Sequence, residues 1–267
     1  MNLFVTGGTG YPGPAVTAAL PADGHTVRAH VRSTASFERL PAGAGPVAGD
    51  LGDAAGLRAR IDESDGVLHA ASPNDATSGS FDAAFLDVAL SALAGSDRPL
   101  VYTGGTWVHG SGAPVTEESP VNPPPMVAWR PAILQRLQTA AADGIRTVVI
   151  APANVYGAGA GIPAMLRGAP TTVGTEPALL YPGNGKHRFA NVHRDDIATL
   201  YALGVRTAPA GSYYLGANAH SPTMTELATA ASRSRGLNGR IAAEPRPTAA
   251  HITVVNTAIP SIQGEES

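Results

Sequence analysis

The chain has 267 residues, a formal charge of −3 at pH 7 and 43% hydrophobic residues, enough for a sizeable core in one large domain or a main domain with a smaller lobe. The weakly acidic charge argues against nucleic acid and anionic membranes as partners, and no apolar stretch is long enough to span a bilayer. The absence of cysteine excludes disulfides, thiolate metal sites and a cysteine nucleophile. We therefore expect a cytoplasmic protein, a monomer or a homodimer, that takes a small-molecule substrate.

A glycine-rich turn lies between the first apolar run, residues 3–5, and a helix-like segment at residues 15–20. A dinucleotide site is built in this order, because the free N–H groups of the first helical turn face the pyrophosphate. Gly7 permits the tight turn, Gly10 lets the backbone approach the pyrophosphate, and Gly13 lets the helix pack closely on the sheet. An ordinary strand-to-helix loop is the alternative. The cofactor contacts predicted in this turn are Gly7, Thr9, Gly10, Tyr11, Pro12 and Gly13.

The predicted second strand, residues 26–31, ends at Arg32 and Ser33. An acidic residue about 20 positions after the glycine turn binds the ribose 2′-hydroxyl of NAD, whereas an arginine accommodates the 2′-phosphate of NADP. The sequence therefore predicts NADP or NADPH rather than NAD, with a solvated arginine as the alternative. A brief strand at 46–51 is predicted to bring Asp50 and Leu51 beside the adenine, and Asp53 is expected to cap a helix at 54–61.

Strands and helices continue to alternate through the first 150 residues. Strands are predicted at 65–72, 99–103 and 145–150, and helices at 81–93 and 126–143. This order predicts an α/β fold, a Rossmann-type doubly wound parallel sheet with right-handed crossovers. His69 lies inside an apolar strand, so we expect a core histidine bonded to backbone groups, with a catalytic histidine as the alternative.

The rest of the chain has shorter elements and more Pro and Gly. We expect residues 1–157 to form the dinucleotide-binding core and residues 158–267 to form mainly a smaller substrate-binding lobe, with some elements returning to the core. The elements expected there are helices at 194–205 and 223–235 and strands at 212–215 and 251–255. The eight histidines form no metal-ligand pair, so no metal site is predicted.

Ordered motifs over about the first 200 residues resemble the short-chain dehydrogenase/reductase superfamily in its extended form, which includes nucleotide-sugar epimerases and dehydratases. The matching segments are residues 6–13, 50–51, 69–71, 101–103, 152–157 and 192–197. In that superfamily the segment corresponding to residues 50–51 lies at the adenine, and the segment corresponding to 70–71 lies along the cofactor. The segment corresponding to 152–157 lies behind the nicotinamide. The contacts that the resemblance implies here are Asp50, Leu51, Ala70, Ala71, Ser72, Pro152, Asn154 and Val155.

The catalytic residues of the superfamily are replaced in this chain. Its members carry a Ser or Thr after the fifth strand and a Tyr-x-x-x-Lys on the following helix, in which the tyrosine delivers a proton and the lysine holds the ribose. These positions fall here on Gly105, Met126 and Arg130. Methionine cannot donate a proton and a guanidinium cannot exchange one near neutral pH. Arg130 and Thr103 remain predicted cofactor contacts.

We interpret the chain as an NADPH-dependent reductase of a ketone with an unusual proton donor, like some ketoreductases that tailor aromatic polyketides in antibiotic pathways. Hydride transfer is the chemistry of the cofactor, so loss of the tyrosine need not abolish it. The candidate proton donors, for which packing at strand exits is the alternative role, are Thr103, Thr106, His109 and Tyr156. Water or a phenolic hydroxyl of the substrate could serve instead. The predicted substrate contacts are Trp107, Met126, Trp129 and Tyr156.

Two other functions stay open at this point. A catalytically silent NADP-binding sensor or scaffold would retain the cofactor site and lose the tyrosine and lysine. A nucleotide-sugar epimerase or dehydratase is the weaker alternative, because those reactions begin with proton removal by the missing tyrosine.

Overall fold

The computed structural model describes residues 1–112 and 114–244, and the strand expected at 251–255 lies outside them. The chain divides into two compact units. The first comprises Met1–Gly157 and Asn191–Asn218, and the second comprises Ala158–Ala190 and the described residues from Ala219 onward. The first unit is therefore assembled from two separate stretches of sequence.

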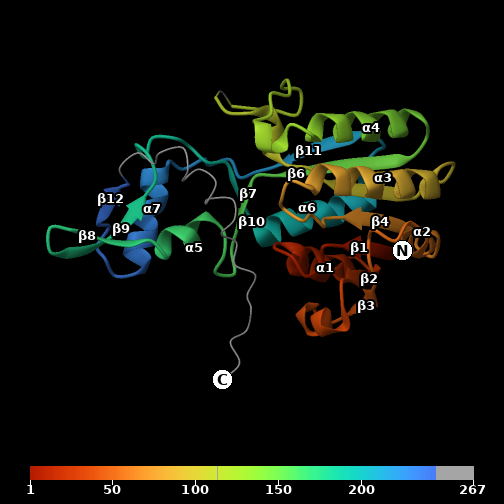
Figure 1. Cartoon of the computed structure of the whole chain (residues 1–267), viewed down its shortest axis with the longest axis horizontal. Helices are drawn as coiled ribbons and strands as arrows, with labels where there is room; N and C mark the ends of the chain where they lie inside the picture. Colours follow the sequence, from red (N-terminus) through yellow and green to blue (C-terminus); the bar gives the residue numbers. More distant parts are fainter. Residues whose placement is uncertain (113, 245–267) are drawn as a thin grey trace. The chain divides into compact units, whose positions relative to one another are not determined.

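A seven-stranded sheet, parallel throughout, forms the centre of the first unit (Figure 1). Its strands, from one edge to the other, are β11 Ser212–Gly216, β6 Arg146–Pro152, β5 Pro99–Thr103, β4 Gly66–His69, β1 Asn2–Thr6, β2 Thr26–Val31 and β3 Ala44–Ala48. The chain winds outward in opposite directions from β1 and β4, and ligands of such sheets bind at the carboxyl ends of the strands near this switch point. The predicted Rossmann-type α/β fold is confirmed.

Helices cover both faces of the sheet. The α-helices of the first unit are α1 Gly13–Ala22, α2 Ala54–Asp62, α3 Ser78–Leu93, α4 Arg130–Ala142 and α6 Arg194–Thr207. Helices α1 and α6 share one buried apolar cluster with the strands, and α2, α3 and α4 share a second. Within β1, Leu3 and Val5 belong to the first cluster and Phe4 to the second. Apolar residues therefore run continuously along the strand, because both of its faces are buried.

Helix α4 begins at Arg130, four residues later than the start expected from the sequence. Met126 lies instead in a separate 3₁₀ turn, η3 Pro125–Val127. The physical reason is Pro131, which has no N–H to bond the carbonyl of Val127 and whose ring clashes with that carbonyl in an α-helix. Proline is tolerated in the first turn, where it stands here. Met126 and Arg130 are therefore not one turn apart on a common helix.

The remaining short elements of the first unit connect its larger ones. They are the 3₁₀ helices η1 Thr34–Arg39 and η2 Thr106–His109 and the parallel strand pair β7 Asn154–Tyr156 and β10 Asn191–His193. Asp53 caps α2 as expected, because its carboxylate accepts a hydrogen bond from the Gly56 amide.

The second unit has its own small core. Its elements are α5 Ile162–Arg167, β8 Pro170–Val173, β9 Glu176–Tyr181, α7 Met224–Ser234 and β12 Ile241–Ala243. The three strands form one sheet, and the buried residues Leu166, Leu179 and Met224 join α5, β9 and α7. Thr223 and Glu226 form a reciprocal capping box at the start of α7.

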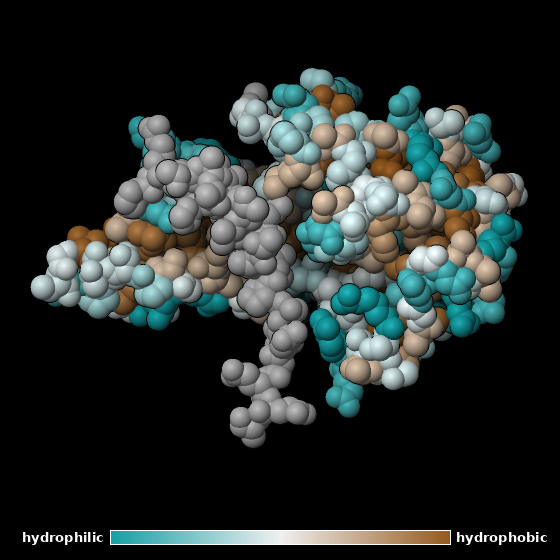
Figure 2. Space-filling model, in the orientation of Figure 1, coloured by the Kyte–Doolittle hydropathy of each residue, from teal (hydrophilic) through white to brown (hydrophobic). Residues whose placement is uncertain are grey.

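Among residues 1–112 and 114–244, no helix combines the length and apolar character that a transmembrane segment requires. On the face shown in Figure 2, the first unit carries hydrophilic and hydrophobic residues side by side.

The junction of β1 and α1 depends on close backbone contact. Gly7 adopts a positive φ of 79°, and a Cβ at this residue would lie 2.3 Å from the Ala70 carbonyl oxygen. A Cβ on Gly13 would lie 2.0 Å from the Gly7 carbonyl oxygen. Because both obstacles are backbone atoms, a side chain could enter only if the turn itself moved.

We predict that Gly13→Ala destabilises the protein by at least about 2 kcal/mol, because the added methyl overlaps a carbonyl that cannot rotate away. The matched control is Gly49→Ala, where an added Cβ meets no heavy atom within 4 Å and stability should change by less than about 0.5 kcal/mol. Urea denaturation measures both variants. Equal midpoints would contradict the prediction.

Candidate functional site

The inner side of the glycine turn leaves room for a ligand. The Gly10 amide donates to the Gly7 carbonyl at 3.0 Å, and a Cβ on Gly10 would meet only that oxygen, at 3.4 Å. Packing within the protein therefore does not require glycine at position 10. Pro12, the N-cap of α1, offers no side-chain hydrogen bond to the first turn, so the helix end lacks the usual intramolecular cap. An open glycine turn at an uncapped helix N-terminus fits a pyrophosphate.

A cavity of about 100 Å³ is lined by residues of β1, β2, β3 and α2 and of the segment after β3 that was predicted to lie at the adenine. Asp50 and Leu51 line it together with Phe4, Leu57 and His30. His30 is buried, its Nε2 lies 2.9 Å from the Gly49 carbonyl oxygen, and burial lowers the pKa of its imidazole. Sequence reasoning missed His30, although its place between the apolar residues Ala29 and Val31 was a signal.

Arg32 and Ser33 lie exposed at the end of β2. Within the described residues Arg32 has no carboxylate partner. A second guanidinium, that of Arg39 on η1, reaches the glycine turn, where its Nη2 donates to the Thr9 carbonyl at 2.9 Å. Two cations thus lie near the end of β2 and the glycine turn. The sequence reasoning missed Arg39, because only the fold of η1 brings it back to Thr9.

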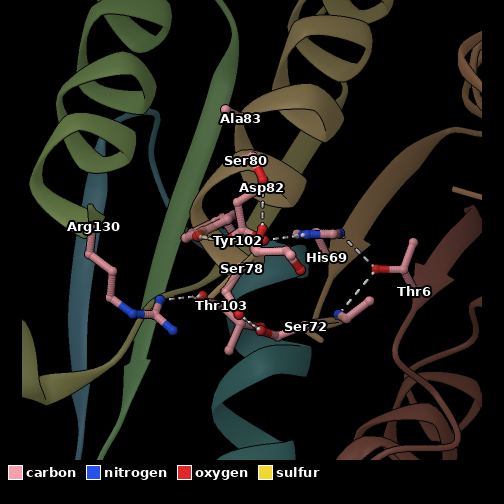
Figure 3. Close-up of polar contacts among 12 residues, drawn as sticks. Thr6, His69, Ser72, Ser78, Ser80, Asp82, Ala83, Tyr102, Thr103 and Arg130 are labelled. Atoms are coloured by element: carbon pink, nitrogen blue, oxygen red, sulfur yellow. Dashed lines mark hydrogen bonds and ion pairs between the residues drawn. The ribbon is translucent and has the colours of Figure 1, made fainter. Parts of the chain in front are cut away.

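A buried row of polar side chains supports the turn formed by Ala70, Ala71 and Ser72 (Figure 3). Thr6 Oγ1 lies 2.8 Å from His69 Nδ1 and accepts a hydrogen bond from the Ala71 amide at 3.4 Å. On its other side, His69 Nε2 lies 3.5 Å from Asp82 Oδ1, and the Tyr102 hydroxyl donates to Asp82 Oδ2. The row therefore links β1, β4, α3 and β5 beneath the edge where the strands end.

The expectation that backbone groups satisfy His69 was wrong, because its neighbours are the side chains of Thr6 and Asp82. The ring is 1% exposed and stacks on Phe85 with 3.6 Å between ring centroids, which makes it a core histidine rather than an accessible one. Burial, and then the Asp82 charge, raise the pKa of Tyr102 far above its ordinary value, so Tyr102 stays a neutral donor.

Thr103 and Gly105 lie at the exit of β5, and Arg130 reaches this exit from the start of α4. Arg130 Nη1 donates to the Thr103 carbonyl at 3.4 Å, as Figure 3 shows. The Thr103 hydroxyl accepts a hydrogen bond of 2.7 Å from Tyr201 on α6. Burial raises the pKa of Tyr201 well above its ordinary value, with opposing effects from Thr103 and Arg130. Thr103 and Arg130, both predicted cofactor contacts, are thus brought together.

The other candidate proton donors lie in different surroundings. His109 is buried, with Nε2 2.9 Å from the Tyr213 hydroxyl and Nδ1 3.4 Å from the Pro120 carbonyl. A cavity of about 190 Å³ beside it is lined by residues of α4, β6 and β11. Burial, and then the charge of Glu117, raise the pKa of Tyr213 to about 12. Thr106 is half-buried at the start of η2.

Tyr156 lies on β7, in register with His193 of β10, and the two rings meet edge to face with 5.3 Å between centroids. Tyr11 of the glycine turn donates its hydroxyl to the carbonyl of Gly157 at 3.1 Å, so the segment after β6 adjoins that turn. The predicted cofactor contacts Asn154 and Val155 belong to this segment, and Pro152 is the last residue of β6 before it. Burial raises the pKa of Tyr11, against a smaller opposite effect of Arg194.

The predicted substrate contacts also differ in exposure. Trp107 and Met126 are 43% and 44% exposed on η2 and η3. Trp129 is half-buried against Gly79 of α3, whose Cβ would lie 3.0 Å from the tryptophan side chain. The Arg130 guanidinium covers the Trp129 ring at 4.5 Å from its centroid. Trp129 therefore has a packing role that Trp107 and Met126 do not share.

Comparison with known proteins places the sequence in a family. The sequence model of the NAD dependent epimerase/dehydratase family matches residues 3–216. An uncharacterised protein of Schizosaccharomyces pombe is 33% identical over 80% of this chain and 74% of its own length. The 4-hydroxy-2-methyl-3-oxo-4-farnesyl-3,4-dihydroquinoline-1-oxide ketoreductase of Stigmatella aurantiaca is 26% identical over 94% of this chain and 79% of its own.

Among solved structures, the UDP-glucose 4-epimerase of Thermus thermophilus in complex with NAD has a TM-score of 0.75 and 22% identity, and the match covers 92% of this chain and 88% of that one. A likeness at this identity establishes the fold. The family match and the fold, together with the glycine turn, indicate an oxidoreductase or epimerase that uses a nicotinamide dinucleotide. The chain belongs to the NAD dependent epimerase/dehydratase family, within the extended short-chain dehydrogenase/reductase superfamily.

Proposed function

We propose that the protein is an NADPH-dependent reductase of a ketone on an aromatic or other flat, apolar metabolite, such as a polyketide. The observation that carries the proposal is the contrast between two parts of the first unit. The glycine turn is open at Gly10 and adjoins an uncapped helix N-terminus, whereas Gly105 after β5, Met126 on η3 and Arg130 at the start of α4 stand in place of the hydroxyl, phenol and amine of the superfamily. Reactions that begin with proton removal by that phenol are therefore disfavoured, and hydride delivery is retained.

Two further observations support a ketone and an apolar substrate. The Stigmatella relative is named as a ketoreductase of a farnesylated quinoline oxide, and the match covers most of this chain. Trp107 and Met126 expose apolar side chains on the segments that follow β5 and precede α4. Such side chains suit a flat, weakly polar molecule.

In this proposal the residues of the chain bind and orient both molecules. The glycine turn holds the pyrophosphate, Asp50 and Leu51 border the adenine, and Arg32 binds the 2′-phosphate together with Arg39. The row from Thr6 to Tyr102 holds the turn after β4 in shape. NADPH, when bound, supplies the hydride. The proton comes from the substrate, from water or from one of the candidate side chains.

A catalytically silent NADP-binding sensor is the second candidate, favoured by the loss of both the tyrosine and the lysine. Two measurements separate the candidates. Quenching of protein fluorescence reports NADPH binding, and absorbance at 340 nm reports its oxidation with a panel of aromatic and quinonoid ketones. A reductase binds and oxidises NADPH, a sensor binds it without turnover, and failure to bind either reduced nicotinamide cofactor contradicts both.

For the cofactor preference, we predict that the protein binds NADPH more tightly than NADH and that Arg32→Ala weakens NADPH binding at least tenfold with little effect on NADH. A charge-assisted hydrogen bond to the 2′-phosphate contributes about 1.5–3 kcal/mol, and NADH has no such group. Arg28→Ala on the same strand is the matched control, because Arg28 pairs with Glu63 at 2.7 Å. An unchanged preference in Arg32→Ala, measured by fluorescence titration, would refute the assignment.

For the proton donor, we predict that Thr106→Val and Tyr156→Phe each retain kcat within tenfold, because water or the substrate can replace a single hydroxyl. A tenfold loss corresponds to about 1.4 kcal/mol of barrier. Tyr214→Phe on β11 serves as the control for removal of a phenolic hydroxyl. A loss of more than tenfold in one variant alone, with NADPH binding retained, would identify that side chain as the acid.

A further inference from the structure

Arg130 is a cation whose donors are mostly unused. It has no carboxylate partner among residues 1–112 and 114–244, whereas Arg136, six residues further along α4, pairs with Asp87 at 2.6 Å. Within the described part of the chain its one hydrogen bond, to the Thr103 carbonyl, is long at 3.4 Å. A guanidinium carries five N–H donors, so most of them remain for a ligand.

The position of this guanidinium is nevertheless fixed. Its Cζ lies 4.5 Å from the centroid of the Trp129 ring, a cation–π arrangement, and Trp129 in turn packs on Gly79 of α3. A charged group held in place by packing stabilises a developing charge better than a mobile one, because little reorganisation is needed.

Gly105 leaves the space in front of the guanidinium open. A Cβ at this residue would lie 3.8 Å from Arg130 Cζ and 3.9 Å from Nε, so a longer side chain at position 105 would extend toward the charge. The charge also reaches the neighbouring tyrosines. It lowers the pKa of Tyr102, Tyr201 and Tyr213, although burial outweighs it in each case.

We propose that Arg130 binds the carbonyl oxygen of the substrate and stabilises the alkoxide formed when hydride arrives, which makes it a catalytic residue and the substitute for the missing hydroxyl and phenol. This inference rests on the proposed function. A hydride from bound NADPH would form a C–H bond at the carbonyl carbon as the C4–H bond of the dihydronicotinamide breaks, which gives NADP⁺, while the π electrons of the C=O bond move to oxygen. The alkoxide would then take a proton from water, and the hydroxide left behind would be neutralised by the solvent. Arg130 stays protonated throughout.

This role of Arg130 differs from that of a residue that only holds the cofactor ribose. The effects of its removal on kcat and on cofactor affinity separate the two roles. An oxyanion contact forms fully only in the transition state, so its loss lowers kcat, by about 100-fold for one donor group. A ribose contact is present in the ground state, so its loss weakens cofactor binding and leaves kcat at saturation nearly unchanged.

The test compares Arg130→Gln and Arg130→Lys with Arg136→Gln, which removes a charge from the same helix outside the site. We expect Arg130→Gln to lower kcat about 100-fold and to change the Kd for NADPH less than threefold, and Arg130→Lys to recover part of the loss. The control should match the wild type. A tenfold weaker affinity for NADPH with unchanged kcat would overturn the proposal.

A binding measurement keeps the proposal testable without turnover. Benzoate, like the alkoxide, offers an anionic oxygen next to an apolar group, and we expect it to bind the NADP⁺ complex of the wild type and of Arg136→Gln but not that of Arg130→Gln. If the wild type reduces no ketone, the proposed function fails, whereas Arg130-dependent binding of benzoate still supports the oxyanion site. Benzoate binding that survives in Arg130→Gln overturns the site. Thermal melting of the same samples verifies that each variant is folded.

Discussion

Close contact between the backbones of Gly7, Gly13 and Ala70 is the constraint on which the site depends. Three segments, the end of β1, the start of α1 and the turn after β4, meet there without any side chain between them. This proximity aims the free end of α1 at the space beside Gly10 and sets the turn after β4 next to it. Protein interiors are packed too densely for such a contact to adapt to an added carbon atom. The shape of this turn is therefore determined by backbone atoms, and the Arg39 guanidinium is hydrogen-bonded at its edge, to the Thr9 carbonyl.

The polar row beneath this cradle illustrates a second constraint. Asp82 is 3% exposed, and a carboxylate so deeply buried needs partners on each side. Tyr102 and His69 are those partners, and Thr6 extends the row to the turn at Ala71. A buried polar group that loses its hydrogen-bond partner typically costs about 1–3 kcal/mol, so the row favours the one arrangement of its four elements in which these contacts form. Its contribution is stability and shape, since none of its members is accessible to a substrate.

Much of this fold could be predicted from the sequence. Apolar runs of strand length, separated by helix-like segments, predicted the doubly wound parallel sheet, and the glycines predicted the first turn, since both signals are local. The start of α4 was missed although its cause, Pro131, is also local. The partners of His69 and the approach of Arg39 to Thr9 depend on distant segments, Asp82 and η1, whose packing no local pattern specifies. The site was therefore predictable where backbone geometry defines it and not where side chains from separate elements meet.

The interrupted sequence of the first unit affects how the protein is made. Valines of β1, β5 and β6 share a buried cluster with Ile197 and Tyr201 of α6, which follow the intervening residues 158–190. A chain leaving the ribosome therefore exposes the apolar face that α6 will cover, on a nearly complete sheet, until α6 has been translated. Partly synthesised sheets of this kind are prone to aggregation. Ribosome pausing between codons 158 and 190 would thus lengthen the interval in which a nascent chain needs a chaperone.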